Sequence, residues 1–204
     1  HAVLTAEDFL GDSSFVMYLG DNLLQGGLVS LADKFRSNEP DAMILLTKVP
    51  DPEHYGVAEL DGDRVVALAE KPAEPKTDLA LVGVYMFTPA IFEAARAIEP
   101  SARGELEITD VNRAYMALGE LSVQVLGRGI AWLDTGTHES LLQASEFISA
   151  VEQRQGLKVA CLEEIGLRMG YLSPPQVLTL ADDLGRTEYA HYLRHIVHEK
   201  ETGV

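Results

Sequence analysis

The chain has 204 residues, of which 47% are hydrophobic and 24% charged, so it can fill the core of an ordinary soluble domain. Its 32 acidic residues against 16 Lys and Arg give a formal net charge of −16, which argues against a nucleic-acid polymer as partner because phosphate contacts need a basic surface. The single Cys161 excludes an internal disulfide and favours a reducing, cytoplasmic location, and no apolar run approaches the length of a membrane span.

An alternation of apolar runs and helical patterns predicts an α/β fold for the first part of the chain. Residues 1–10 continue a helical pattern that has no start signal, so we expect the upstream part of a longer protein to be absent. A strand at 15–19, a helix near 28–35 and a strand at 42–49 predict a βαβ unit with a right-handed crossover. Because the apolar runs have the composition of strands buried on both faces, we expect a mostly parallel sheet.

A hairpin interrupts this pattern, and a helical region follows it. Two β-prone runs at 56–60 and 64–68 flank an Asp-Gly turn, which predicts an inserted β-hairpin layer. The remaining elements of this part are a strand at 79–87, helices at 89–98 and 105–118, and short strands at 121–126 and 131–133. Further helices are predicted at 137–156, 162–169, 174–183 and 186–199. We therefore divide the chain into a partial core, residues 1–136, and a C-terminal helical appendage, residues 137–204.

Charged residues lie where predicted strands or loops end. Asp21 follows the strand at 15–19 and Asp134 follows the strand at 131–133, and in open α/β sheets ligands bind in the crevice beyond the carboxyl ends of the strands. Two carboxylates there can hold Mg²⁺, and Lys71 and Arg103 can bind phosphate. Each residue alone is also compatible with a cap, a turn or a surface ion pair, but the combination favours phosphoryl or nucleotidyl transfer.

Six motifs follow one another along the chain: Gly20-Asp21-Asn22, Tyr55-Gly56-Val57, Glu70-Lys71-Pro72, Gly83-Val84-Tyr85, Arg103-Gly104-Glu105-Leu106-Glu107-Ile108-Thr109-Asp110 and Trp132-Leu133-Asp134-Thr135-Gly136-Thr137. In order and spacing this series resembles the glucose-1-phosphate thymidylyltransferases, a family of sugar-1-phosphate nucleotidyltransferases. The resemblance implies a Rossmann-like nucleotidyltransferase fold. It also implies Mg²⁺-assisted transfer of a deoxythymidylyl group from dTTP to glucose 1-phosphate, giving dTDP-glucose and pyrophosphate in deoxysugar biosynthesis.

The resemblance assigns roles to individual residues. Asp21 and Asp134 match the Mg²⁺ ligands, Lys71 and Arg103 the catalytic residues that bind the sugar phosphate, Glu70 a ligand of the sugar hydroxyls, Gly56 a backbone contact to the sugar, and Tyr85 a wall of that pocket. Shorter members are homotetramers with a regulatory nucleotide site at a subunit interface, which here would include Gly127, Arg128, Val159, Cys161 and Glu164. Ala160 and Leu162 replace the Ser and Pro that are more usual in this region.

One departure from the family leaves alternatives open. The glycine-rich nucleotide loop and the segments that recognise the base have no counterpart, so we expect this chain to correspond to the C-terminal two-thirds of the enzyme and to show weak or no turnover alone. A nucleotidyltransferase for another base or sugar is an alternative, as is a non-catalytic sugar-phosphate-binding fragment of the same fold.

Three conspicuous features are better explained by packing or solvation than by chemistry. His191, His195 and His198 share one helix face but lack the Glu that accompanies the first His of a metalloprotease helix, so solvated or interface histidines are favoured over a zinc site. Cys161 has no His near it in the sequence to activate it as a nucleophile. Trp132 is expected in the core, beside Asp134.

Overall fold

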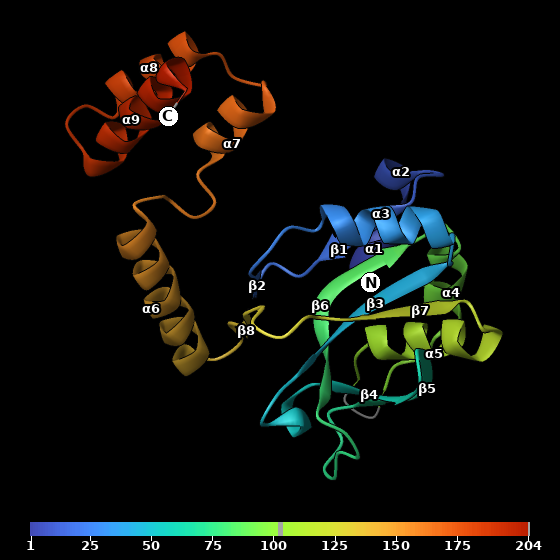
Figure 1. Ribbon diagram of the computed structural model, residues 1–204. Coiled ribbons are helices and arrows are strands. Elements are labelled where there is room, and N and C mark those ends of the chain that lie inside the picture. The colour runs from blue at the N-terminus through green and yellow to red at the C-terminus, as the bar shows by residue number, and fades with distance from the viewer. Residues whose placement is uncertain (102–103, 204) are drawn as a thin grey trace. The chain divides into compact units, whose positions relative to one another are not determined.

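The computed structural model describes residues 1–101 and 104–203 (Figure 1). It divides into two compact units, His1–Leu141 and Leu142–Val204. Within the described residues, no helix combines the length and apolar character that crossing a membrane requires.

Within the described residues, the first unit contains a six-stranded sheet with β6 (Leu79–Phe87) at its centre. One edge of β6 pairs with β3 (Ala42–Lys48), and β7 (Leu121–Val125) lies beyond β3. The other edge pairs with β1 (Phe15–Tyr18) near one end and with β4 (Gly56–Asp61) near the other. The hairpin formed by β4 and β5 (Arg64–Glu70) extends the sheet on that side, as the sequence predicted.

The α/β class, the inserted hairpin and the C-terminal helices are confirmed, but the prediction of a mostly parallel sheet is wrong. β6 is antiparallel to β1, β3 and β4, and β4 is antiparallel to β5, whereas β3 and β7 are parallel. β1 and β3 do run in the same direction, but β6 lies between them. A long apolar run reports that both faces of a strand are covered and carries no information on the direction of its neighbours, which explains the error.

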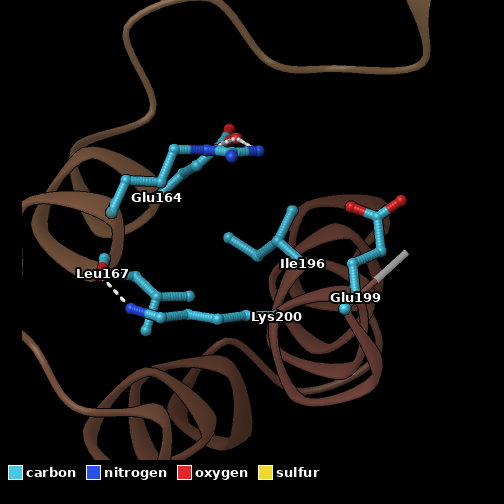
Figure 2. A pocket seen from close by; sticks show the side chains of 7 residues that line it. Glu164, Leu167, Ile196, Glu199 and Lys200 are labelled. Carbon is cyan, nitrogen blue, oxygen red and sulfur yellow. Dashed lines mark hydrogen bonds and ion pairs between the residues drawn. The ribbon is translucent and has the colours of Figure 1, made fainter.

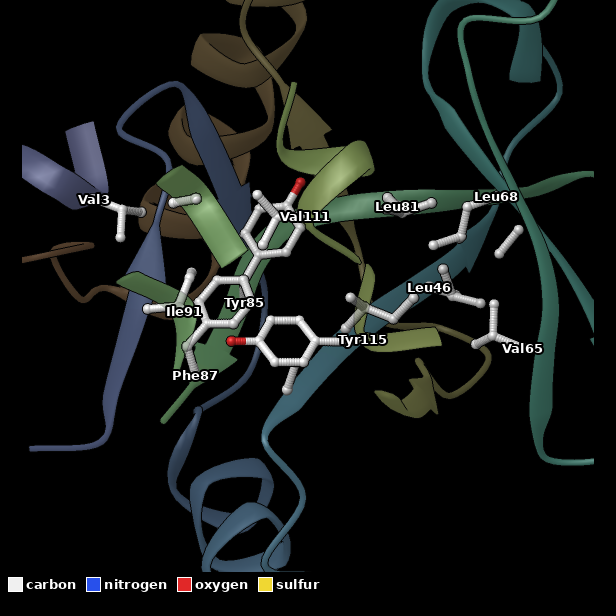
Figure 3. Packing of buried hydrophobic residues seen from close by; sticks show 14 of the residues in the cluster. Val3, Leu46, Val65, Leu68, Leu81, Tyr85, Phe87, Ile91, Val111 and Tyr115 are labelled. Carbon is white, nitrogen blue, oxygen red and sulfur yellow. The ribbon is translucent and has the colours of Figure 1, made fainter. Parts of the chain in front are cut away.

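Helices cover both faces of the sheet because successive residues of β3 and β6 point to opposite sides. Met43 and Met86 pack with Phe35 of α3 (Val29–Asn38) on one face. On the other face, the core contains α1 (Ala2–Thr5), α4 (Ile91–Ala97) and α5 (Ile108–Leu118) (Figures 1 and 3). Tyr115 of α5 stacks there on Phe87 of β6, with ring centroids 6.1 Å apart. This double covering leaves β3 and β6 almost fully buried.

Several elements differ from the predicted ones at their ends. The helix expected at 1–10 is two short helices, α1 and α2 (Glu7–Leu10), and β1 alternates between half-buried and exposed residues, with Val16 and Tyr18 each 41% exposed. α5 begins at Ile108, because Glu107 before it is extended. Two unpredicted elements are a 3₁₀ turn (Pro52–His54) and a strand, β2 (Asn22–Leu24), which pairs with β8 (Trp132–Asp134).

Three helices of the second unit share a small core. They are α7 (Leu162–Met169), α8 (Pro174–Asp183) and α9 (Glu188–Thr202), and the predicted bounds of the first two match. They follow α6 (His138–Gln155), which crosses the boundary between the units in the sequence. Ser173 and Gln176 form a capping box at α8, and the Thr187 hydroxyl accepts the Ala190 N–H at α9. Cys161 is 3% exposed in this core, as expected of a packing residue.

The Tyr115 hydroxyl generates a first prediction. It is buried without a hydrogen-bond partner among the described residues, which costs free energy in the folded state. Tyr115→Phe keeps the ring contacts and removes this hydroxyl, so we expect the free energy of unfolding to stay level or rise by about 1 kcal/mol. Urea denaturation at pH 7 measures this free energy. A decrease of about 1 kcal/mol in Tyr115→Phe would contradict the expectation. The control Tyr115→Ala leaves a cavity and should cost about 3–5 kcal/mol.

The same hydroxyl generates a prediction on pH. Burial, followed by the Asp41 carboxylate, raises the pKa of Tyr115 from 10.0 to about 12. Because the folded state binds this proton more tightly than the unfolded state does, ionisation of the phenol lowers the stability of the fold as the pH rises from 10 to about 12. We therefore expect the stability of the wild type relative to Tyr115→Phe to fall between pH 10 and 12. If the difference in stability between the wild type and Tyr115→Phe did not change with pH, the phenol would have the same pKa in the folded and unfolded states.

Candidate active site

The ribbon of β2 and β8 brings together two acids that are far apart in the sequence. Asn22 of β2 lies opposite Asp134 of β8 in the antiparallel register. The N–H and the hydroxyl of Thr135 both donate to the Asp21 carbonyl, at 2.8 Å each. Asp21 and Asp134 therefore occupy adjacent ends of the two paired strands.

One oxygen of each carboxylate is oriented by a neighbouring donor. Asp21 Oδ1 accepts from the Asn22 side-chain amide at 2.9 Å, and Asp134 Oδ1 accepts from the Gly136 N–H at 2.8 Å. Such outer hydrogen bonds typically orient metal-binding carboxylates. In the described ranges, no group of three or more His, Cys, Asp or Glu side chains gathers as a complete metal site. The oxygen pair fits Mg²⁺, which binds proteins through one or two carboxylates and fills its shell with phosphate oxygens and water.

A cavity of about 180 Å³ gathers most of the predicted substrate residues. Its lining includes Gly56, Glu70, Lys71, Tyr85 and Asp134. They come from β4, the end of β5, β6 and β8, so the sheet and the ribbon both contribute to it. From β6, the alternate residues Leu81, Gly83 and Tyr85 all line the cavity. Arg103, predicted to bind phosphate, lies outside the described residues.

Glu70 is held at the point where β4, β5 and α5 meet. It pairs with Gly56 across the hairpin, and its Oε2 accepts from the Thr109 hydroxyl at 2.6 Å. A Cβ at position 56 would lie 3.1 Å from Glu70 Oε2 and 3.2 Å from Thr109 Oγ1. The close approach of these two side chains to the backbone therefore favours Gly at position 56.

Lys71 adopts an unusual backbone conformation beside Glu70. Its φ is 42°, in the left-handed region that L-residues seldom adopt, and its N–H donates to the Tyr55 carbonyl at 3.0 Å. In the part of the chain that the structure describes, its ammonium makes neither a hydrogen bond nor an ion pair. Because Lys71 lines the cavity, its ammonium can bind an anionic group of a ligand there.

Nearby carboxylates contribute to raised pKa values of two tyrosines that line the cavity, Tyr55 and Tyr85. Burial, and then the carboxylates of Glu70, Asp134 and Asp21, raise the pKa of Tyr85, whose side chain is buried. Burial raises the pKa of Tyr55 as well, with smaller effects of Asp51 and Asp134. Both phenols are therefore neutral at physiological pH, and a phosphorylated ligand would need cations to offset the repulsion of these carboxylates.

Asn22 joins the acidic end of the site to the sheet. Its Oδ1 accepts from the Gly83 N–H at 3.0 Å and from the Trp132 indole N–H at 2.7 Å. The Trp132 ring lies edge-on to Tyr55, with centroids 5.1 Å apart. Trp132 packs on the apolar residues beneath it, as predicted, and also lines the cavity.

Sequence reasoning assigned no role to Asn22 or Thr109, although both line the cavity. Each stands inside a quoted motif, one residue after Asp21 and one before Asp110, and this was the only signal available. Their hydrogen-bond partners Gly83, Trp132 and Glu70 are distant in the sequence, so only the fold reveals the contacts.

The residues predicted for a regulatory site lie in several places. In the first unit, Gly127 lines a second cavity, of about 220 Å³, and Arg128 is exposed. In the second unit, Val159 and Cys161 line a cavity of about 570 Å³. Their regulatory role stays a prediction.

Glu164 lines another cavity of the second unit, of about 410 Å³, between α7 and α9 (Figure 2). Its carboxylate accepts from the Tyr192 hydroxyl and from Arg168, the latter at 2.7 Å. Lys200 donates to the Leu167 carbonyl on the other side of the cavity. These contacts tie α9 to α7 within the helical unit.

The chain is similar to known proteins in sequence and in structure. A family model described as nucleotidyl transferase matches residues 1–151. The glucose-1-phosphate thymidylyltransferase of Neisseria gonorrhoeae is 42% identical over 198 residues, covering 96% of this chain and 69% of that protein. The enzyme of the same name from Mycolicibacterium smegmatis is 43% identical, with 96% and 68% covered.

A solved structure is similar as well. It is described as a glucose-1-phosphate thymidylyltransferase from Bacillus anthracis in complex with sucrose, and it superposes with a TM-score of 0.66 at 37% identity. The match covers 72% of this chain and 58% of that one. The chain thus spans about two thirds of the length of the relatives it matches by sequence, and less of this structure.

The contact between Asn22 and Gly83 generates a prediction. A Cβ at position 83 would lie 2.6 to 2.7 Å from three atoms of the Asn22 side chain. Gly83→Ala should therefore displace Asn22 from Trp132 and destabilise the first unit by about 1–3 kcal/mol. Trp132 is the single tryptophan of the chain, so its fluorescence spectrum reports the displacement directly.

Gly127→Ala is the matched control, because a Cβ there would meet only Ile130 Cδ1, at 3.9 Å. We expect it to leave the Trp132 emission and the stability unchanged. An unaltered emission spectrum in Gly83→Ala would contradict the contact.

Proposed function

This chain belongs to the nucleotidyl transferase family, and on that premise we propose that it carries the sugar-phosphate and metal site for transfer of a deoxythymidylyl group from dTTP to glucose 1-phosphate. The product would be dTDP-glucose, a precursor for deoxysugar biosynthesis, with release of pyrophosphate. The observation that carries the proposal is the single cavity shared by Gly56, Glu70, Lys71 and Asp134, with Asp21 on the adjacent strand end. The names of the similar proteins support the choice of base and sugar.

The residues from the hairpin and β6 would bind the sugar. The Glu70 carboxylate can accept hydrogen bonds from sugar hydroxyls, and Gly56 lets the sugar approach the backbone closely. The Tyr85 phenol, which is neutral at physiological pH and whose pKa burial raises further, forms a wall without adding charge. Small-molecule sites commonly combine an aromatic side chain with a few polar groups that fix the orientation of the ligand, as Tyr85 and Glu70 would do here.

The cations would bind the phosphate, because three carboxylates in one site would otherwise repel it. The Lys71 ammonium lines the cavity, and Arg103 can bind phosphate through two hydrogen bonds. Bound at Asp21 and Asp134, Mg²⁺ would neutralise charge on the phosphate oxygens. The main contribution of the protein is then to hold the sugar-phosphate oxygen in line with the α-phosphorus, and such positioning contributes about 7–11 kcal/mol in favourable cases.

The proposal includes a homotetramer and a cytoplasmic location. The resemblance of the sequence motifs to those of the shorter, tetrameric thymidylyltransferases supports the first, and the single free cysteine supports the second. A nucleotidyltransferase acting on another base or sugar, or a non-catalytic sugar-phosphate-binding protein, is the alternative. A pure binder would have no need for the paired acids.

Binding measurements on the 204-residue chain test the proposal. We expect glucose 1-phosphate to bind more tightly with Mg²⁺ than without it, as measured by calorimetry. Asp21→Asn and Asp134→Asn should each reduce the gain in affinity for glucose 1-phosphate that Mg²⁺ produces by at least about tenfold, because each removes a negative oxygen donor. Asp63→Asn removes an exposed carboxylate in the hairpin turn and serves as the control, which should bind like the wild type.

The outcomes separate the alternatives. Binding of glucose 1-phosphate that is indifferent to Mg²⁺ in the wild type would favour the non-catalytic binder. Metal-dependent binding that survives both substitutions would reject Asp21 and Asp134 as the ligands. Tighter binding of another sugar 1-phosphate would redirect the proposal to that sugar.

A further inference from the structure

The side-chain amide of Asn22 makes hydrogen bonds in two directions. Its Oδ1 accepts from the Gly83 N–H at 3.0 Å and from the Trp132 indole N–H at 2.7 Å, and its Nδ2 donates to Asp21 Oδ1 at 2.9 Å. The backbone N–H and the indole N–H can only donate, so they identify the accepting atom as the amide oxygen and leave the amide nitrogen for Asp21. The orientation of this amide is therefore determined by its partners.

The amide oxygen of Asn22 is held by two groups that are themselves fixed. Gly83 belongs to β6, which is paired along both edges and covered by helices on both faces. A Cβ at position 83 would lie 2.6 to 2.7 Å from Cγ, Oδ1 and Nδ2 of Asn22, so the amide lies directly against the strand. Trp132 packs on a cluster that includes the buried Leu45 and Val82. Two anchored donors therefore set the position of this amide.

The Asp21 carboxylate at the other end of the amide is exposed. An exposed side chain keeps rotamer freedom, and a cation that binds the carboxylate would restrict that freedom. With Asp21 ordered, its Oδ1 would hold the Asn22 amide nitrogen more persistently, and the amide oxygen would remain in place for Trp132. A second ligand that needs the same groups in the same place then has less ordering to do, which produces positive cooperativity.

We propose that Asn22 is a positioning residue that links a divalent cation at Asp21 to the Trp132 wall of the cavity. The inference rests on the proposed function and adds to it a dependence of cation and sugar binding on each other that passes through the protein, apart from any contact between cation and phosphate. Trp132 lines the cavity and lies edge-on to Tyr55, so it belongs to the surface that a sugar would meet. Such linkage is reciprocal, because each ligand changes the affinity of the other by the same factor.

The indole N–H of Trp132 makes the first step of this linkage measurable in the wild type. Trp132 is the single tryptophan of the chain, so an isotope-labelled sample gives one indole peak in its nitrogen–proton NMR spectrum. We expect this peak to move as Mg²⁺ is added, with the same dissociation constant that calorimetry measures for Mg²⁺. Binding of Mg²⁺ that leaves the indole peak in place would overturn the inference.

Asn22→Ala removes the amide and tests whether the signal depends on it. Hydrogen-bond partners of metal ligands typically contribute 10- to 100-fold to metal affinity, so we expect Mg²⁺ to bind about tenfold more weakly. At saturating Mg²⁺, the indole peak should move far less than in the wild type. Trp132 also stands two residues before Asp134, so a movement that survives Asn22→Ala reaches the indole through that acid and rejects the proposal.

Gln25→Ala is the matched control. Gln25 follows β2 directly, and its side-chain amide accepts from the Ala131 N–H at 3.4 Å and lines the second cavity. The substitution therefore removes an amide from the same ribbon at a place remote from the acids in the register of β2 and β8. We expect it to keep both the Mg²⁺ affinity and the movement of the indole peak.

Glucose is the probe for the linkage itself, because it lacks the phosphate that Mg²⁺ would attract directly. In the wild type, we expect saturating glucose to tighten Mg²⁺ binding about fivefold, as measured by calorimetry, which is at the lower end of typical coupling between two sites. In Asn22→Ala, this ratio should fall towards onefold. A lowered melting temperature with an unchanged ratio shows a purely structural role of Asn22 and rejects the proposal.

The outcomes separate this inference from the proposed function. Failure of the wild type to bind glucose 1-phosphate in the presence of Mg²⁺ would overturn the proposed function, and the inference with it. Binding of glucose 1-phosphate together with a Mg²⁺ affinity that is indifferent to glucose would overturn the inference alone. Should Asn22→Ala fail to fold, the indole peak and the effect of glucose on Mg²⁺ affinity in the wild type still decide, because the proposal requires both.

Discussion

The antiparallel pairing of β2 with β8 is the interaction on which the candidate site depends. It is short, yet it places Asn22 opposite Asp134 and so brings Asp21 beside the second acid. Asn22 then links this ribbon to β6 through the Gly83 N–H and to the cavity wall through Trp132. Without the pairing, the two acids would be isolated turn residues, and the cavity would lack the side that the ribbon supplies.

The second requirement is a rigid strand for the ribbon to bind to. β6 is paired along both edges and covered by helices on both faces, so its residues lie at fixed positions. That rigidity holds the carboxylates of the site in place although they repel one another. The carboxylates of Glu70, Asp134 and Asp21 all act on the Tyr85 phenol, and this negative field explains why a cation is needed wherever a phosphate is to bind.

Much of this arrangement could be predicted from the sequence, and the remainder has identifiable physical reasons. Apolar periodicity located β3, β6, α7 and α8, and the order of the motifs selected residues that the fold gathers in one cavity. Strand direction was not predictable, since an apolar run records burial and not the direction of its neighbours. β2 was missed because a three-residue strand has too few residues for a pattern. The contacts of Asn22 and Thr109 were missed because their partners are brought near only by the tertiary fold.

The alternation of β6 also limits how this protein can vary. Leu81, Gly83 and Tyr85 line the cavity, whereas the intervening Val82 and Val84 fill the core on the opposite face. Inserting or deleting one residue within the strand would exchange these two sets, turning the cavity-lining residues to the core and the core valines to the cavity. A length change in the loops outside β6 would alter neither set. The composition of the cavity lining thus depends on the register of β6 as well as on its individual side chains.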